Sequence, residues 1–234
     1  MNIIITGASR GIGFEVVKHL IDGEDHNIIA VSRNYKSLLM LEGQCKKINE
    51  NAAVIPVSLD LNSPDFEDKL IKTIEGRFKH IDILINNAGY IINKPLIEIS
   101  NEEFDKVFSV NIKAPFRLVK ALFPYFSSKA HIVNIASMGG VQGSMKFPGL
   151  SAYSASKGAL AIMTEAMAEE FKEQGIAVNC LALGSAQTEM LKEAFPNYEA
   201  PVTAEQMAAF ISYFALNGNN FFNGKTLPVA VTVP

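Results

Sequence analysis

The sequence predicts an α/β fold: a doubly wound, Rossmann-like, mostly parallel sheet of about seven strands, with helices on both faces in three layers. Short apolar runs rich in β-branched residues alternate with longer segments of helical periodicity. Runs that are apolar throughout are typical of strands buried on both faces. Alternation of strands and helices implies parallel strands joined by right-handed crossovers.

The predicted strands occur in order along the chain. They are Ile3–Ile5, Ile28–Val31, Ala53–Val57, Ile81–Ile85, His131–Ile135, Ala177–Leu181 and a weaker Thr226–Val231. The helical patterns between them include Phe14–Ile21, Lys36–Ile48 and Phe66–Ile74. Because 234 residues suit one large domain and no linker, repeat or low-complexity segment divides them, we expect a single Rossmann-like domain over residues 1–234.

Two later helices, Phe104–Phe126 and Ala152–Phe171, are apolar around most of their circumference. In the second, Leu160, Ile162 and Met163 cover more than one face. Such a helix needs burial on all sides, either by the sheet and its other helices or by a second subunit. We favour the second subunit, and expect a homodimer or homotetramer built on these helices.

Composition and charge limit the partners. The chain carries a net charge of −3 and no basic cluster, so no nucleic-acid partner is expected. Cys45 and Cys180 are too few for a disulfide framework and lack metal-ligand spacing, so we expect buried free thiols and no metal. No signal peptide and no apolar stretch near the ~20 residues of a membrane span are present, and a cytoplasmic protein is expected.

The first strand ends in a glycine-rich turn, Thr6-Gly-Ala-Ser-Arg-Gly-Ile-Gly13. Gly7, Gly11 and Gly13 allow a tight turn and close approach of phosphate to backbone N–H groups, and the following helix N-terminus favours an anion. A plain loop is the alternative, but the position after the first strand favours a nucleotide site that includes Ser9 and Ile12.

The second strand ends at Ser32-Arg33, without the Asp or Glu typical of NAD-selective dehydrogenases. Arg33, together with Arg10 from the glycine turn, matches a 2′-phosphate chemically, and a carboxylate would repel it. The alternative is that both arginines are solvated surface charges. We expect NADP(H) rather than NAD(H).

Two further strand ends carry candidate cofactor contacts. Asp60, followed by Leu61, can accept a hydrogen bond from the adenine amino group or cap a helix beginning near Ser63. After the fourth strand, Asn87, Ala88 and Gly89 belong to an Asn-Asn-Ala-Gly segment at the edge where such sheets bind ligands.

Tyr153 and Lys157 are four residues apart at the start of a long helix, so the phenol and the ammonium project from one face. A nearby cation favours phenolate, and lowering a tyrosine pKa from about 10 by roughly three units requires about 4 kcal/mol. We expect Lys157 and an oxidised nicotinamide together to supply this interaction free energy. Alone, the pair also fits a surface Tyr–Lys pair; Ser137, which ends the fifth strand, adds a hydroxyl able to stabilise a carbonyl oxygen.

Asn111 lies four residues before Pro115 in the long helix. Proline has no N–H, so it cannot bond the Asn111 carbonyl in a regular helix. We predict local unwinding there, and a freed carbonyl that holds a water in a proton path from Lys157 to bulk solvent.

These motifs together resemble the short-chain dehydrogenase/reductase family, in its compact single-domain branch and most like the 3-oxoacyl-[acyl-carrier-protein] reductases. The resemblance covers nearly the whole chain: Thr6–Gly13, Asn-Asn-Ala-Gly at 86–89, and Asn111, Ser137, Tyr153 and Lys157 in order. It implies hydride transfer between nicotinamide and a carbonyl or alcohol. Tyr153 would be general acid/base, Ser137 the carbonyl orienter, Lys157 the pKa modulator and ribose ligand, and Asn111 part of the relay.

The resemblance also extends the expected cofactor contacts to Gly184, Ala186 and Thr188, although Leu183 replaces the family's usual proline. The segment 188–201, usually a substrate lid, is short, which implies a more open site or a partner completing it. The usual C-terminal Asp-Gly-Gly is absent.

The substrate side is expected along the stretch Met138–Leu150, with Met138, Val141, Met145, Phe147 and Leu150. These suggest a partly apolar ketone or aldehyde. The acyl-carrier-protein reductases present basic residues beside the cleft to an acidic carrier. The corresponding stretches here carry few basic residues, so an acyl-carrier substrate is not favoured. The rival hypothesis is a catalytically idle NADP(H)-binding sensor or scaffold subunit, against which the intact Ser137, Tyr153 and Lys157 argue.

Overall fold

The computed structural model describes residues 1–22 and 25–231, and confirms the predicted fold class. Seven strands form one sheet in the order β3-β2-β1-β4-β5-β6-β9, and every neighbouring pair is parallel. The strands are β1 (Asn2–Thr6), β2 (Asn27–Ser32), β3 (Ala53–Ser58), β4 (Ile81–Asn86), β5 (Phe126–Ser137), β6 (Ala177–Leu183) and β9 (Thr226–Val229).

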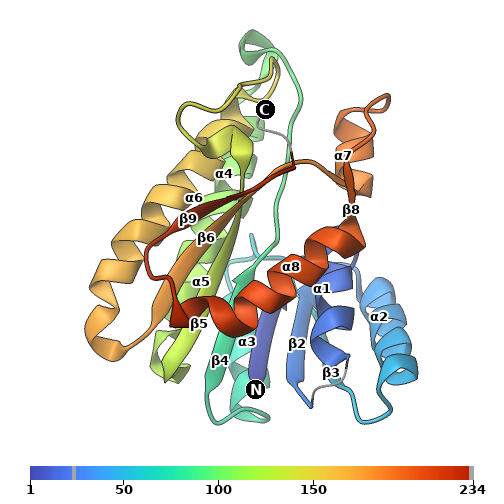
Figure 1. The fold of residues 1–234 in the computed structure, drawn as a ribbon, viewed down its shortest axis with the longest axis vertical. Coiled ribbons are helices and arrows are strands. Elements are labelled where there is room, and N and C mark those ends of the chain that lie inside the picture. Colours follow the sequence, from blue (N-terminus) through green and yellow to red (C-terminus); the bar gives the residue numbers. More distant parts are fainter. Residues whose placement is uncertain (23–24, 232–234) are drawn as a thin grey trace.

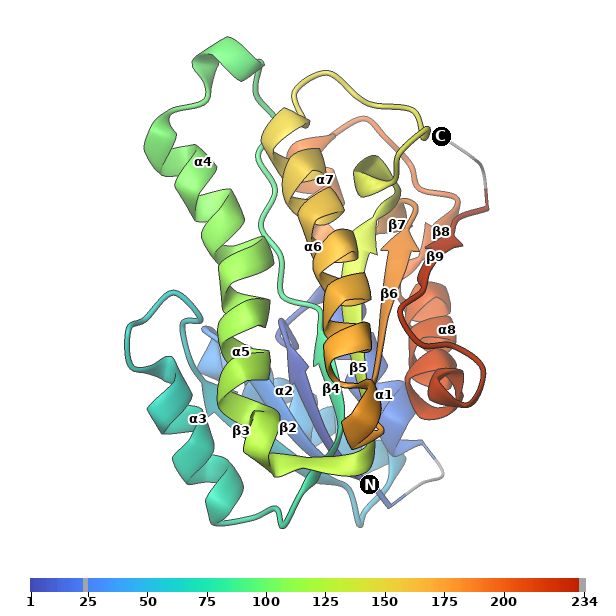
Figure 2. The ribbon, with the colours of Figure 1, turned by 90° about the vertical axis from the view of Figure 1, so that its left-hand side faces the viewer.

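Helices cover both faces of this sheet (Figures 1 and 2). One face carries α1 (Gly11–Ile21), α2 (Tyr35–Ile48) and α8 (Ala204–Asn217); the other carries α3 (Phe66–Glu75), α4 (Asn101–Phe108), α5 (Ala114–Leu122) and α6 (Ser151–Glu170). Short 3₁₀ turns occupy Leu96–Glu98, Phe123–Tyr125, Met138–Gly140, Lys172–Gln174 and Gly218–Asn220.

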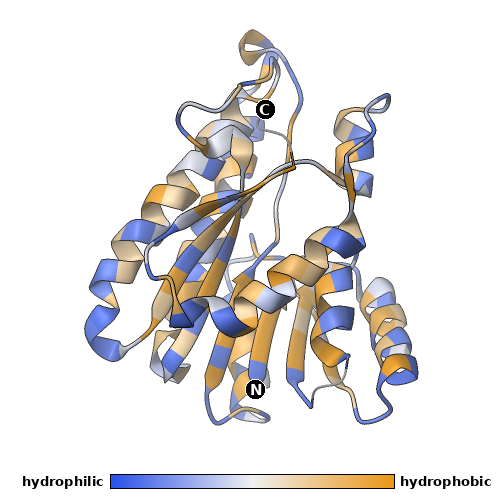
Figure 3. Ribbon diagram, viewed as in Figure 1, coloured by the Kyte–Doolittle hydropathy of each residue, from blue (hydrophilic) through white to orange (hydrophobic). Residues whose placement is uncertain are grey.

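The core explains the continuous apolar runs of the sequence. Ile3 and Ile5 pack in one cluster with α1, α2 and α8, whereas Ile4 packs in the other with α3 and α5. Successive side chains of a strand point to opposite faces, so burial of both faces requires every residue to be apolar. Figure 3 shows strands that are mostly hydrophobic and helices in which hydrophobic and hydrophilic residues alternate along the chain.

The structure corrects several predicted element bounds and adds one helix. The helix predicted over 104–126 is α4 and α5 joined by a π-helical turn, Ser109–Lys113, and Phe126 already begins β5. The last strand ends at Val229 rather than Val231. Helix α8 was not predicted, although Thr203 and Gln206 form a capping box, a recognisable start signal.

A short excursion leaves the sheet after β6. Ala186–Gln187 (β7) pairs in parallel with Val202–Thr203 (β8), and helix α7 (Glu189–Ala194) lies between them in the chain. We call residues 188–201 the lid. The β7–β8 pairing fixes both ends of the lid next to the carboxyl edge of the sheet.

Within residues 1–22 and 25–231, none of the helices has the length and apolar character needed to cross a bilayer. The same part of the chain holds no cluster of three or more His, Cys, Asp or Glu suited to a metal ion. Cys45 and Cys180 are buried free thiols, as predicted.

Candidate active site

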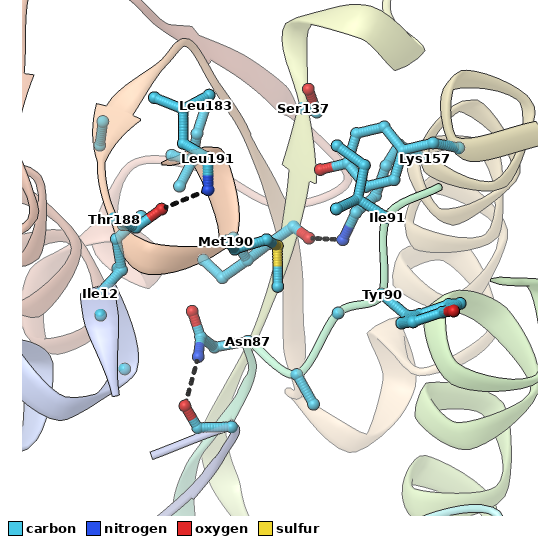
Figure 4. Close-up of a pocket in the computed structure, with 18 of the residues that line it drawn as sticks. Ile12, Asn87, Tyr90, Ile91, Ser137, Lys157, Leu183, Thr188, Met190 and Leu191 are labelled. Carbon is cyan, nitrogen blue, oxygen red and sulfur yellow. Dashed lines mark hydrogen bonds between the residues drawn. The ribbon is translucent and has the colours of Figure 1, made fainter. Parts of the chain in front are cut away.

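A cavity of about 520 Å³ lies at the carboxyl edge of the sheet. All the residues predicted to contact cofactor line it: Gly7, Ser9, Arg10, Gly11, Ile12, Gly13, Arg33, Asp60, Leu61, Asn87, Ala88, Gly89, Tyr153, Lys157, Gly184, Ala186 and Thr188. Ser137 lines it as well. Figure 4 views the cavity with Ile12 and Thr188 on one side and Lys157 on the other. The fold thus gathers segments far apart in sequence around one space.

The glycine turn packs against the segment after β4. Gly7 has a φ of 71°, in the left-handed region that favours glycine. A Cβ on Gly13 would lie 2.4 Å from both Asn87 Nδ2 and the Gly7 carbonyl oxygen. Asn87 Nδ2 in turn donates to the Thr6 and Gly7 carbonyls, at 3.0 and 3.2 Å. Glycine at position 13 is therefore required for the turn and β4 to meet.

Thr6 was identified as the first residue of the glycine-rich turn, but no role was predicted for its side chain. Its buried hydroxyl Oγ1 accepts hydrogen bonds from the backbone N–H groups of Asn87 and Ala88, at 3.1 and 3.0 Å. One threonine thereby holds the two cofactor-side segments in register.

The predicted 2′-phosphate readers differ in their surroundings. Arg33 is exposed at the cavity rim. Arg10 donates from Nη1 to Glu193 Oε1 of α7 at 2.6 Å, and this hydrogen bond raises the pKa of the guanidinium. The predicted 2′-phosphate site therefore contains a carboxylate from the lid.

Asp60 does not cap a helix, so that alternative is wrong. Its Oδ1 accepts from the Asn62 backbone N–H at 3.0 Å and closes a local turn, whereas α3 begins at Phe66 after Asp65. Asp60 lies on the cavity wall.

Ser137, Tyr153 and Lys157 come together where β5 ends and α6 begins. The Ser137 hydroxyl accepts from the Gly139 N–H at 3.2 Å, and it lies close enough to the Tyr153 phenol to oppose a rise in the pKa of that phenol. Lys157 Nζ donates to the Ile135 carbonyl at 2.7 Å and lies 5.8 Å from the Tyr153 ring centroid. A hydroxyl, a phenol and an amine thus share one wall of the cavity.

Burial dominates the titration of this group. Desolvation raises the pKa of Tyr153, and the nearby Ser137 hydroxyl opposes that rise. Burial also lowers the pKa of Lys157 to about 8. The lowering of the Tyr153 pKa expected from the Lys157 cation is absent in the protein alone, because both groups favour their neutral forms when removed from water.

Asn111 lies behind the cavity rather than in its wall, and is 1% exposed. The unwinding predicted from Pro115 is confirmed: the Ala114 N–H bonds the Ser109 carbonyl across a π-helical turn. The Asn111 side chain accepts from the Tyr90 N–H at 2.8 Å and donates to the Tyr90 carbonyl and Ser156 Oγ, both at 2.9 Å.

Ser156 was not predicted. Its hydroxyl is fully buried and donates to the Tyr153 carbonyl at 2.7 Å. Asn111 therefore joins the segment after β4 to the first turn of α6, which carries Tyr153.

The apolar side of the cavity comes from two segments. Met138, Phe147 and Leu150 line it as predicted, whereas Val141 does not and Met145 is 58% exposed. The lid contributes side chains that were not predicted: Met190, Leu191, Phe195 and Tyr198. Leu183, in place of the usual proline, lines the cavity beside Leu191 of the lid (Figure 4). Thr188 caps α7 by accepting from the Leu191 N–H at 3.2 Å (Figure 4).

Fold and site together define a Rossmann-type oxidoreductase that uses a nicotinamide cofactor, and comparison with known proteins agrees. A family model described as short chain dehydrogenase matches residues 1–199. The chain belongs to the short-chain dehydrogenase family.

Three relatives illustrate its range. The chain is similar to carbonyl reductase [NADPH] 2 of Sus scrofa, with 31% identity over 76% of this chain and 69% of the relative. It is 26% identical to 3-oxoacyl-[acyl-carrier-protein] reductase of Salmonella typhimurium over 97% of this chain and 94% of the relative, in line with the predicted resemblance. A solved 4-hydroxyisoleucine dehydrogenase complexed with NADH aligns with a TM-score of 0.82 and 29% identity, covering 98% of this chain and 96% of that one.

Proposed function

We propose that the protein is an NADP(H)-dependent oxidoreductase that reduces a ketone or aldehyde to an alcohol, or performs the reverse oxidation. The convergence of Ser137, Tyr153 and Lys157 on the cavity that also contains the glycine turn carries this proposal. The whole activity is assigned to one domain spanning 1–234, of which residues 23–24 and 232–234 lie outside the described structure.

The cavity fits a dinucleotide. Gly11, Ile12 and Gly13 line the cavity at the start of α1, where the helix dipole favours phosphate. Arg10 and Arg33 offer guanidinium groups at the rim. The bound nicotinamide would supply or accept the hydride.

The chain's own groups handle the carbonyl oxygen and the proton. Ser137 donates a hydrogen bond to the substrate oxygen and stabilises its developing negative charge. Tyr153 donates a proton to that oxygen during reduction, and its raised pKa keeps it protonated near neutrality. Lys157 binds the cofactor ribose and stabilises the phenolate that remains.

Asn111 acts as a positioning residue in this proposal. Its bonds to Tyr90 and Ser156 hold α6 against the segment after β4. The π-helical turn at Asn111 supports a water that relays protons between Lys157 and bulk solvent.

The preference for NADP(H) rests on Arg10, on Arg33 and on the lack of a carboxylate at the end of β2. The relatives named above include a protein named for NADPH and one complexed with NADH, so cofactor choice is assigned from this chain's own residues. A 2′-phosphate is a better partner for two guanidinium groups than a ribose hydroxyl is.

A homodimer or homotetramer is part of the proposal. Phe104 on α4, Phe116 on α5 and Ile162 on α6 are 43%, 51% and 66% exposed on the outer face of the molecule. A second copy packed on these helices would remove these side chains from water.

The activity is tested by following loss of nicotinamide absorbance with NADPH and a panel of apolar ketones and aldehydes. Turnover that disappears in Tyr153→Phe and persists in Tyr213→Phe, an exposed tyrosine of α8, is the expected result. Nucleotide binding without turnover across the panel would favour the idle sensor or scaffold instead.

A further inference from the structure

The end of helix α7 is fastened to two sides of the cavity. Glu193 bonds Arg10 of the glycine turn at 2.6 Å, and the Ala194 carbonyl accepts from Asn93 Nδ2 at 2.8 Å. Asn93 follows β4 and packs against Gly149, next to Leu150 of the substrate-side stretch. The lid is thus tied to the cofactor side by an ion pair and to the substrate side by a neutral hydrogen bond.

A second carboxylate of α7 faces the same turn. Glu189 lies one helical turn before Glu193, lines the cavity, and has Oε2 3.6 Å from the position of a Cβ on Gly11. It also contributes to the raised pKa of Arg10. The lid therefore brings two negative charges to the turn where an anionic nucleotide is proposed to bind.

We propose that Glu193 is a specificity-determining residue that competes with the cofactor 2′-phosphate for Arg10. The inference rests on the proposed function. Arg10 has one guanidinium, and a carboxylate bonded to it opposes a phosphate dianion at the same place. Glu193 bonds Arg10 through Nη1, so a 2′-phosphate on the same guanidinium lies beside the carboxylate and weakens or displaces that bond, whereas NAD(H), which has no 2′-phosphate, leaves the pair intact.

The competition couples cofactor choice to the lid. When the 2′-phosphate takes Arg10, α7 loses its ion pair with the glycine turn and keeps the Asn93–Ala194 bond on the substrate side. The lid is accordingly more tightly fastened with NAD(H) than with NADP(H). Glu193 weakens the selectivity for NADP(H) that the two arginines create.

The expected effect is modest because the pair is partly solvated. The Arg10 and Glu193 side chains are 49% and 63% exposed, and exposed ion pairs are weak. Replacing Glu193 by Gln keeps the shape and removes the charge. We expect Glu193→Gln to raise NADPH affinity relative to NADH affinity by about two- to fivefold at low ionic strength.

The experiment measures dissociation constants of NADPH and NADH by nicotinamide fluorescence for the wild type, Glu193→Gln and the control Glu199→Gln. Glu199 is an exposed carboxylate of the same lid. The ratio of the two constants should change in Glu193→Gln alone, and by less when Arg10→Gln is also present. Loss of lid stability by itself would change both affinities together and leave the ratio constant.

An unchanged ratio in Glu193→Gln, or an equal change in Glu199→Gln, would overturn the competition. A wild type that binds neither nucleotide would overturn the proposed function and the competition with it. A wild type that prefers NADH, with Glu193→Gln shifting it toward NADPH, would refute the NADP(H) preference and support the competition.

Discussion

Two buried basic side chains lie next to β5: Lys157 at the candidate active site and His131 beneath α8. Burial lowers the pKa of both. Lys157, whose Nζ bonds the Ile135 carbonyl near the carboxyl end of the strand, is 3% exposed, and burial lowers its pKa to about 8. His131, four residues earlier on β5 than that carbonyl, is 1% exposed, and burial lowers its pKa to about 4.

Their surroundings differ. His131 Nε2 accepts from Asn179 Nδ2 at 3.1 Å, so its Nδ1–H donates to the Ala215 carbonyl at 3.0 Å and the ring is neutral. The Lys225 N–H bonds Asn179 Oδ1 and fixes the orientation of that amide. The ring also packs on Phe214, with centroids 5.5 Å apart.

Lys157, in contrast, has one fixed acceptor and borders the cavity. A shifted pKa therefore does not identify a catalytic group by itself. Access to a cavity beside a phenol and a hydroxyl separates Lys157 from a histidine that only joins β5 to α8.

The largest expected effect is at Lys157. Lys157→Met should lower kcat/KM for carbonyl reduction on the order of 10²–10⁴-fold, because Tyr153 would lose its cationic neighbour and the ribose its ligand. Lys172→Met, at an exposed lysine after α6, should leave it unchanged. Steady-state kinetics measure both variants, and near-normal turnover in Lys157→Met would remove the distinction between the two bases.

The next effect is on stability at His131. A pKa lowered on folding means that the unfolded chain binds the proton more tightly, so stability is lost as pH falls from about 6.5 toward about 4. The loss approaches 3 kcal/mol, on the order of 1.4 kcal/mol per pH unit.

Urea unfolding at several pH values tests this expectation. His131→Gln should show a shallower loss of stability in acid than the wild type, and His80→Gln, at a half-exposed histidine, should follow the wild type. Parallel profiles for the wild type and His131→Gln would mean that the buried ring does not resist protonation.

The smallest effect is the pH dependence of the reaction. Because Lys157 loses its proton near pH 8, kcat/KM for reduction should fall above that pH by about tenfold per unit. Lys157→Arg, which stays charged, should retain its own activity to higher pH. A wild-type rate that is constant well above pH 8 would assign the cationic role to another group.

Much of the site was predictable because its signals are local. The glycine turn, the Tyr153–Lys157 spacing and the irregular helix before Pro115 each depend on residues within about two helical turns, and the structure places them as expected. The apolar strands follow from burial on both faces, which leaves little choice of residue at each position.

What the sequence by itself determined is the fold class, the family and the part of the cavity wall formed by the glycine turn, Ser137, Tyr153 and Lys157. Only the tertiary structure decided which partners they have: Arg10 meets Glu193 across 183 positions, His131 meets Ala215 across 84, and Asn111 meets Ser156 across 45. A local sequence pattern does not predict which distant residues come into contact on folding. The pKa of Tyr153 likewise depends on the tertiary structure, because it rises when folding removes the phenol from water.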